Sequence, residues 1–150
     1  MKKLLTVLTL FLLFLLNFNF VFAKEDVKLD TSSPSTKSAA SYSLPYPGLL
    51  PDNPLYIFKV ARDAIIRFFI SDPLKKAEYD LLQADKRLNA GYYLSLKNIG
   101  KDKIVVSTVS KGENYFENSL KETLQAKNQG ADTNDILRRL VASSKKHQEI

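Results

Sequence analysis

Few side chains of this sequence have the chemistry of a catalytic or metal-binding site, and those that do are scattered. The single histidine, His147, lies in the segment Lys-Lys-His-Gln-Glu-Ile, and no second ligand or base of the usual kind accompanies it. We therefore expect it to be exposed or to pack between helices. Glu113 and Glu117 lie four residues apart, which places both carboxylates on one face of a helix. A hard cation needs more oxygen ligands than these two, so a solvated helix face is the better interpretation.

The sequence contains no motif for an activated nucleophile and no cofactor loop. The chain has no cysteine, which excludes disulfides, thiolate metal sites, a cysteine nucleophile and a lipid-acylated cysteine. Its serines form no Gly-x-Ser-x-Gly motif, and there is no glycine-rich phosphate loop. We predict no catalytic residue, no cofactor-binding residue and no metal ligand, and hence no enzyme.

Basic residues occur in doublets, which raises the possibility of polyanion binding. The doublets are Lys75 and Lys76, Lys86 and Arg87, Arg138 and Arg139, and Lys145 and Lys146, with Tyr92, Tyr93 and Tyr115 as aromatic neighbours that could stack on bases. The net charge is +6, or +4 without Lys2 and Lys3, and acidic residues are interspersed throughout. Phosphate binding requires a concentrated basic stripe, so nucleic acid is disfavoured. An anionic envelope surface would explain the same charge.

The first 23 residues have the three parts of a secretory signal peptide. Two lysines precede an apolar run over residues 4–16, and the segment ends in Val-Phe-Ala. We expect cleavage after Ala23, since Asn17 and Asn19 would be costly in lipid. The alternative is a retained membrane anchor, because residues 4–23 have about the length that a span requires. In both cases the remaining chain is exported, either secreted or at the cell surface.

Residues 24–43 form a polar segment rich in serine and threonine. It cannot bury enough apolar surface to offset its chain entropy, so we predict a flexible linker. From Leu44 the composition changes from small polar residues to prolines and large apolar residues. Four prolines lie within residues 44–54, and they prevent a helix from starting before the last of them. We expect the apolar residues of this stretch to pack across the helices that follow: Leu44, Tyr46, Leu49 and Leu50.

Helical periodicity then continues to the end of the sequence. Asp52 or Asn53 should cap a first helix over residues 54–70, whose wide apolar face predicts the most buried helix. We expect Leu55 and Tyr56 to close one end of the core. Asp72 should cap a second helix from Pro73 to about Ile99, ended by Asn98 and Gly100.

The second helix has a seam of alternating large and small residues. The seam contains Leu74, Ala77, Leu81, Ala84, Leu88 and Gly91. Such a seam allows another helix to approach closely, and this is the reason we give for Gly91. A third helix should cover residues 102–128 although its Ile-Val-Val start favours a strand locally. Asp132 or Thr133 should cap a fourth helix that has no stop signal before Ile150, so we expect residues 44–150 to be a domain that continues beyond this sequence.

Four amphipathic helices joined by short turns predict an all-α fold, an antiparallel bundle of about four helices. We expect pairs of acidic and basic residues, four residues apart, on the surface of this bundle. These pairs are Asp63 with Arg67, Asp72 with Lys76, Glu117 with Lys121, and Asp135 with Arg139.

Two segments of the sequence resemble a known bacterial family, the exported helical domain of unknown function 5667. The first match comprises Leu50, Pro51, Pro54, Leu55, Tyr56 and Lys59, and the second comprises Lys76, Ala77, Glu78, Leu82, Ala84, Arg87 and Leu88. The resemblance is specific up to about Gly91. The chain departs from the family pattern at Asn89 and Ala90, where glutamate is expected, and in its valine-rich third helix. The resemblance implies an extracytoplasmic all-helical domain and assigns no functional residue.

These observations favour a non-catalytic helical module that binds another protein, or itself, outside the membrane. The partner is unknown. The alternative is a weakly basic binder of polyanions or of the anionic cell envelope.

Overall fold

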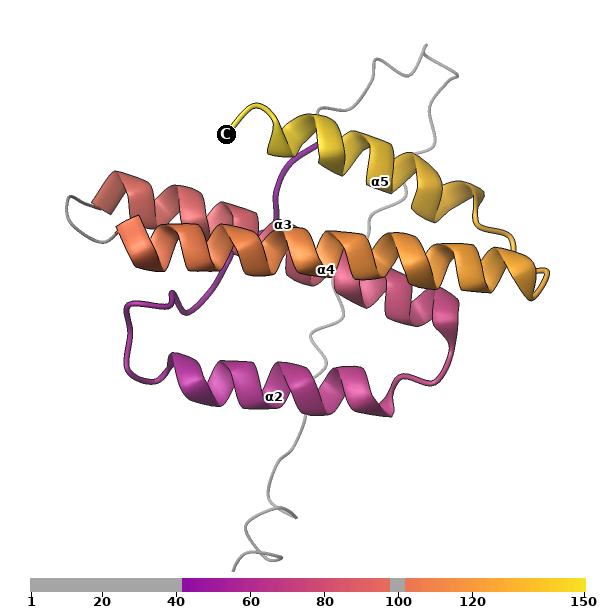
Figure 1. Ribbon diagram of the computed structural model, residues 1–150, viewed down its shortest axis with the longest axis horizontal. Helices are drawn as coiled ribbons and strands as arrows, with labels where there is room; N and C mark the ends of the chain where they lie inside the picture. Colours follow the sequence, from indigo (N-terminus) through magenta and orange to yellow (C-terminus); the bar gives the residue numbers. More distant parts are fainter. Residues whose placement is uncertain (1–41, 98–101) are drawn as a thin grey trace, which may run out of the picture. The chain divides into compact units, whose positions relative to one another are not determined.

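The computed structural model describes residues 42–97 and 102–150, which form four α-helices and no strand. The helices are α2 (Tyr56–Phe69), α3 (Pro73–Lys97), α4 (Asp102–Asn128) and α5 (Asn134–His147). Successive helices run in opposite directions and pack together (Figure 1). The all-α prediction is therefore confirmed. The predicted signal peptide, most of the predicted linker, and the stop at Asn98 and Gly100 lie outside the described residues.

Side chains at the predicted start signals accept backbone hydrogen bonds near the beginning of three of the described helices. Only Asp72 caps its helix as predicted, because Leu55 and Thr133 occupy the N-cap positions of α2 and α5 and make no side-chain cap hydrogen bond. Asn53 Oδ1 accepts a hydrogen bond from the backbone N–H of Leu55 at 2.9 Å, and Asp72 Oδ1 accepts one from Lys75 N–H at 3.0 Å. Asp132 Oδ1 accepts one from Asn134 N–H at 3.0 Å. The bonds of Asp72 and Asp132 satisfy backbone donors that the first turn leaves free, whereas the bond of Asn53 is made to Leu55, which precedes the first turn of α2. The helix bounds consequently lie close to those expected, although α5 ends at His147 and does not reach Ile150.

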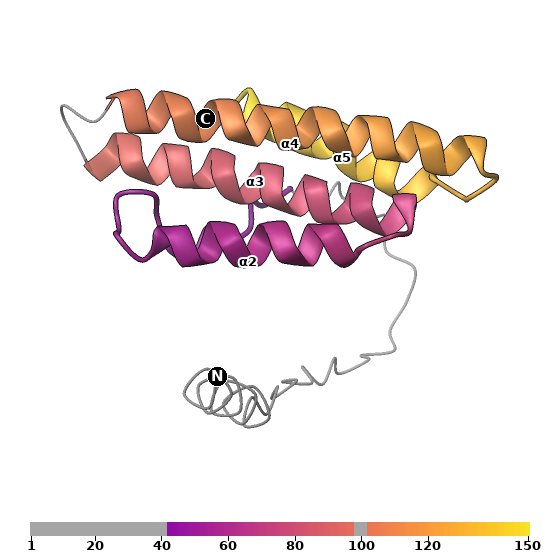
Figure 2. The same cartoon turned by 60° about the horizontal axis from the view of Figure 1, so that its bottom comes forward.

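The central helix is α3, which lies between α2 on one side and α4 on the other (Figure 2). Its most extensive partner is α4. Glycines of both helices lie at this contact: a Cβ atom on Gly91 would lie 2.7 Å from Val109 Cγ2, and one on Gly112 would lie 2.2 Å from Leu88 Cδ2. Both distances are too short for real contacts. The prediction that Gly91 permits a close helix approach is confirmed, and the valine-rich start of α4 is helical.

Replacing Gly91 with leucine should therefore destabilise the protein. We expect the free energy of unfolding to fall by about 1–3 kcal/mol, because the added side chain must push Val109 and α4 away from α3. Urea unfolding followed by circular dichroism measures this change. Lys75→Leu, at an exposed position of the same helix, is the matched control. If both variants unfold at the same urea concentration as the native protein, the close contact between α3 and α4 does not contribute to the free energy of unfolding.

The buried apolar core joins α3 to α5. One cluster of this core consists of Ala77, Leu81, Ile136 and Leu140, with Leu74 and Phe116 packed against it. The buried hydroxyl of Ser119 on α4 donates a hydrogen bond to the Ala77 carbonyl oxygen at 2.7 Å, so α4 is also tied to this core. No residue of α2 belongs to it.

The prediction that the first helix is the most buried is wrong. Its large apolar side chains are mostly exposed, with Phe68 at 82% and Phe69 at 75%, and its one buried residue is Asp63. The helix has the predicted apolar face, but that face is turned away from α3. The physical reason is that the opposite face carries charged and phenolic groups whose partners lie on α3.

The segment before α2 is docked differently from the prediction. Tyr46 is 75% exposed and Leu55 is also exposed, so neither closes the core. Leu44, Leu49 and Leu50 are half-buried. Polar contacts fix the segment instead, since Tyr42 donates a hydrogen bond to Asp85 Oδ2 and Asn89 Nδ2 donates one to the Pro45 carbonyl oxygen at 2.9 Å.

Candidate functional site

The helix α2 has one polar face and one apolar face, and this contrast is the most unusual feature of the described residues. We define the inner face of α2 by Tyr56, Lys59, Asp63 and Arg67, and its outer face by Ile57, Phe58, Ala61, Ile65, Phe68 and Phe69. The inner residues are spaced three or four apart and so share one side of the helix. The inner face is directed toward α3 by polar contacts, and the backbone of α2 stays farther from α3 than that of α4 does.

The strongest of these contacts is the ion pair between Arg67 and Asp80. Arg67 Nε and Nη2 donate to the two carboxylate oxygens of Asp80 at 2.8 and 2.9 Å, the paired geometry that suits guanidinium and carboxylate groups. Asp80 is fully buried. Its hydrogen bonds raise the pKa of Arg67 above the ordinary value, and Glu122 on α4 adds a weaker ion pair at 3.5 Å.

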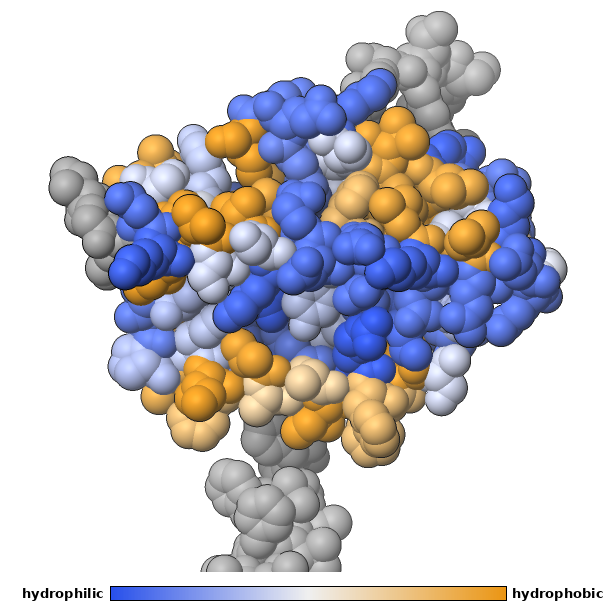
Figure 3. All heavy atoms as spheres, in the orientation of Figure 1, coloured by the Kyte–Doolittle hydropathy of each residue, from blue (hydrophilic) through white to orange (hydrophobic). Residues whose placement is uncertain are grey.

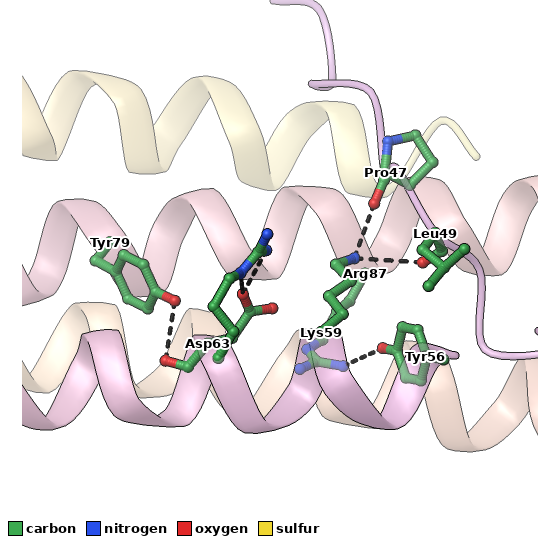
Figure 4. A network of polar contacts seen from close by, with 8 residues as sticks. Pro47, Leu49, Tyr56, Lys59, Asp63, Tyr79 and Arg87 are labelled. Carbon is green, nitrogen blue, oxygen red and sulfur yellow. Dashed lines mark hydrogen bonds and ion pairs between the residues drawn. The ribbon is translucent and has the colours of Figure 1, made fainter. Parts of the chain in front are cut away.

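A second contact joins α2 to Arg87 of α3 (Figure 4). Arg87 Nη1 donates a hydrogen bond to the Tyr56 hydroxyl at 2.6 Å, and its guanidinium carbon lies 4.8 Å from the centre of the Tyr115 ring on α4. This cation–π contact and the hydrogen bond partly compensate for the burial of the arginine, whose Nε is buried without a hydrogen-bond partner in the described part of the chain. Burial raises the pKa of the Tyr56 phenol, although the nearby Arg87 charge acts in the opposite direction.

Lys59 ties α2 to the segment before it. Its ammonium group donates to the carbonyl oxygens of Pro47 and Leu49 at 2.8 and 3.5 Å (Figure 4). Burial lowers the pKa of this lysine. Asp63 accepts two hydrogen bonds from its neighbour Arg62, at 2.7 and 3.1 Å, while its second carboxylate oxygen is buried without a partner in the described part of the chain. Long polar side chains, and not interlocked apolar ones, thus fill the space between α2 and α3.

The Tyr79 hydroxyl completes the inner contacts and makes the stability of the protein sensitive to alkali. It donates a hydrogen bond to the Asp63 carbonyl oxygen at 3.0 Å, and burial raises its pKa to about 12. Burial also raises the pKa of Tyr42 and Tyr56 above 10.0. The folded protein keeps these protons at a pH where the unfolded chain has lost them. The stability that they contribute is complete below pH 10, and the contribution of Tyr79 is lost as the pH rises through about 12.

We therefore expect the free energy of unfolding to fall as the pH rises above 10, as measured by urea unfolding at several pH values. Lys59 has the opposite effect because its pKa is lowered in the folded state, but one lysine opposes three tyrosines. Tyr79→Phe should reduce the alkaline slope and lower stability at neutral pH by about 1 kcal/mol through the lost hydrogen bond. If the dependence of the unfolding free energy on pH above 10 is unchanged in Tyr79→Phe, the Tyr79 hydroxyl is not a source of the sensitivity to alkali.

The outer face of α2 carries no charged residue and is exposed along its length. Figure 3 shows apolar side chains gathered along the α2 edge of the molecule, at the bottom of the view. Ile57, Phe58, Ile65, Phe68 and Phe69 are all more than half exposed. Single exposed apolar residues are ordinary, but a continuous row of them is typical of interaction surfaces.

A groove flanks the outer face at the start of α2. It has a volume of about 610 Å³ and is lined by Tyr46, Pro47, Gly48, Leu49, Leu55, Phe58, Lys59, Arg62 and Lys86. Three of these described lining residues are basic and none is acidic. The groove therefore combines an apolar wall with positive charge.

A separate polar cluster surrounds Asp85 on α3. Asp85 Oδ1 accepts a hydrogen bond from Ser143 Oγ at 2.6 Å and lies 2.8 Å from His147 Nε2, while Oδ2 accepts the one from Tyr42. The expectation that no base lies within reach of His147 is wrong, since this side chain is only 8% exposed and contacts a buried carboxylate. The prediction that His147 packs between helices is confirmed, because its imidazole also contacts the Phe116 ring.

This cluster does not have the geometry of a catalytic triad. In a triad the histidine bonds the carboxylate through one ring nitrogen and the serine through the other. Here Nε2 of His147 faces both Asp85 and Ser143, and the serine hydroxyl donates to the carboxylate directly. The arrangement joins α5, α3 and the segment around Tyr42.

The other residues weighed as candidate sites are dispersed or engaged in pairs. Glu113 and Glu117 are exposed, and no group of three metal-ligating side chains lies together within residues 42–97 and 102–150. Glu117 pairs with Lys121 at 2.7 Å as predicted, which lowers the pKa of that carboxyl. Asp135 lies 3.9 Å from Arg139, also as predicted, whereas Asp63 does not pair with Arg67.

Several residues of the basic doublets are buried or paired with acids within the fold. Arg87 is buried, Lys76 contacts Glu122, and Lys146 contacts Glu149. Arg138 and Arg139 pair with acids on α5 and α3, and Tyr115 is half-buried beneath Arg87. The doublets consequently do not add up to the basic stripe that a nucleic acid needs.

Within residues 42–97 and 102–150, these features define four packed helices, of which α2 presents an exposed apolar face. None of the described helices is long and apolar enough to cross a membrane. Comparisons of the chain with protein-family models, curated proteins and solved structures found no match. The resemblance to the exported helical domain of unknown function 5667 stays a prediction.

Proposed function

We propose that the protein is a non-catalytic helical interaction module that acts outside the cytoplasm and binds through the outer face of α2. The observation that carries this proposal is the row of exposed large apolar side chains on that face. Covering one such side chain stabilises a complex by about 1.5–3 kcal/mol when its burial is complete. A few of them therefore provide enough free energy for binding. The extracytoplasmic location rests on the leader-like residues 1–23.

The inner face of α2 explains why its outer face is presented in this way. Arg67, Tyr56 and Lys59 each have a partner on α3 or in the segment before α2. Rotating the helix to bury its phenylalanines would break these contacts and leave the buried Asp80 carboxylate without its arginine. The cost of an unpaired buried charge, about 3–5 kcal/mol, offsets the gain from covering one or two apolar side chains. The polar contacts thus hold the apolar face outward, available to a partner.

The absence of cysteine from the chain allows a site-specific test. Phe69→Cys and Leu124→Cys each place a single thiol at an exposed apolar position, on α2 and on α4 respectively. In buffer, both full-length variants should react at similar rates with a polar maleimide. In the presence of isolated cell envelopes, we expect the rate at position 69 to fall roughly tenfold and the rate at position 124 to stay unchanged. Equal rates at position 69 with and without envelopes would refute the proposed binding surface.

A further inference from the structure

We infer that the surface covering the outer face of α2 is an anionic lipid bilayer, on which α2 lies in the plane of the interface. This inference rests on the proposed function and names its partner. A helix that lies in a membrane interface has one apolar face and basic residues at its edge. The outer face of α2 has this composition, with three phenylalanines and two isoleucines exposed among its residues.

The shape of the face favours a bilayer over a second copy of this chain. A helix of 14 residues presents a narrow, convex row of apolar side chains about 21 Å long. A stable protein interface buries about 800 Å² of accessible surface on each partner and needs a partner surface of complementary shape. A bilayer requires no complementary shape and accepts the apolar side chains of a single helix.

The charge beside the face favours lipids with anionic headgroups. The groove next to Phe58 is lined by Lys59, Arg62 and Lys86 and by no acidic side chain among its described residues. Lys59 is engaged with backbone carbonyls and Arg62 with Asp63, which leaves the Lys86 ammonium as the groove cation with neither a hydrogen bond nor an ion pair in the described part of the chain. A headgroup phosphate in this groove would lie beside the ring of Phe58 while acyl chains cover the rest of the outer face.

The absence of tryptophan from the chain makes the test local to α2. Phe69→Trp and its control Leu124→Trp, both in the full-length protein, each contain one fluorophore at an exposed position. The probe is a vesicle of phosphatidylcholine mixed with an equal amount of phosphatidylglycerol, with brominated acyl chains as quenchers. We expect the emission of Phe69→Trp to shift to the blue and to be quenched, and the emission of Leu124→Trp to stay unchanged.

Two further changes measure the apolar and charged contributions. Phe58→Ser in the Phe69→Trp background should weaken vesicle binding roughly tenfold, and Lys86→Gln should weaken it roughly fivefold. Vesicles of phosphatidylcholine alone should bind more weakly than the anionic vesicles. Equal quenching by both kinds of vesicle would overturn the assignment of an anionic lipid.

The outcomes separate this inference from the proposed function. Because residues 1–23 could bind vesicles by themselves, the readout is the fluorescence at position 69 and not sedimentation of the protein. An unquenched Phe69→Trp on vesicles overturns the inference. If the cysteine at position 69 is nevertheless protected by envelopes, the proposed docking surface stands and its partner is a protein. Burial of Phe69→Trp that increases with protein concentration in lipid-free buffer would identify a second copy, which also overturns the inference.

Discussion

Arg67→Met is expected to lower the free energy of unfolding by about 3 kcal/mol, because it leaves the Asp80 carboxylate charged, fully buried and without its main partner. Methionine keeps most of the apolar stem of the side chain, so the loss reports the charge and not the packing. Urea unfolding measures it. Arg138→Met on α5 removes an exposed ion pair and should cost less than about 0.5 kcal/mol.

The double variant Arg67→Met with Asp80→Leu tests the mechanism. Replacing a whole buried ion pair by apolar side chains is often neutral, so we expect most of the lost stability to return. Hydrogen exchange adds a local measurement. In Arg67→Met the amides of α2 should exchange faster than in the native protein, while those of α4 change less, because α2 depends on this contact for its attachment to α3. If Arg67→Met costs no more than Arg138→Met, the ion pair does not hold α2.

Asp85→Ala should have an effect of similar size, a loss of about 3 kcal/mol, since it leaves Ser143, His147 and Tyr42 without their common acceptor in a buried setting. The matched control is Asp135→Ala at an exposed position of α5, which should change the free energy of unfolding by less than about 0.5 kcal/mol. Asp85→Asn keeps the volume and one acceptor oxygen, so its effect should be smaller than that of alanine.

Limited proteolysis locates the effect of Asp85→Ala. Cleavage within α5 and in the segment around Tyr42 should become faster, because both are tied to α3 through this carboxylate. A variant that unfolds at a lower urea concentration but is cut no faster in either place would contradict the assignment of Asp85 as the link between them.

The helix bounds could be predicted from the sequence because they depend on local chemistry. Asn53, Asp72 and Asp132 accept hydrogen bonds from amides within three residues, so their effect is visible in the sequence itself. The close approach at Gly91 was also predictable, since small residues recur with large ones along α3. These features need no knowledge of the distant chain.

The orientation of α2 could not be predicted from its apolar periodicity. A periodic pattern identifies a face but does not say which molecule covers it. The signal for the actual arrangement lay in the polar residues: Tyr56, Lys59, Asp63 and Arg67 repeat at helical spacing as regularly as the phenylalanines do. Asp80 and Arg87 lie seven residues apart on α3, next to its apolar seam. Two matched polar rows of this kind are the sequence pattern of a polar contact between helices.

The Asp85 cluster had no comparable signal. His147 is 62 residues from Asp85 along the chain, and neither residue lies in a short motif. The lone histidine was correctly predicted to pack between helices, but its partner is set by how α5 crosses α3. Only the three-dimensional arrangement brings the imidazole and the carboxylate together.

The dominance of the contact between α3 and α4 has a consequence for how the chain folds. These helices are neighbours in the sequence, and such local contacts close at a small entropic cost and favour fast folding. The bonds of Asp85 to Tyr42 and His147 span much longer loops. We therefore expect the hairpin of α3 and α4 to form in the folding transition state, with both ends of the described chain joining it afterwards, and substitutions at Asp85 to accelerate unfolding more than they slow folding.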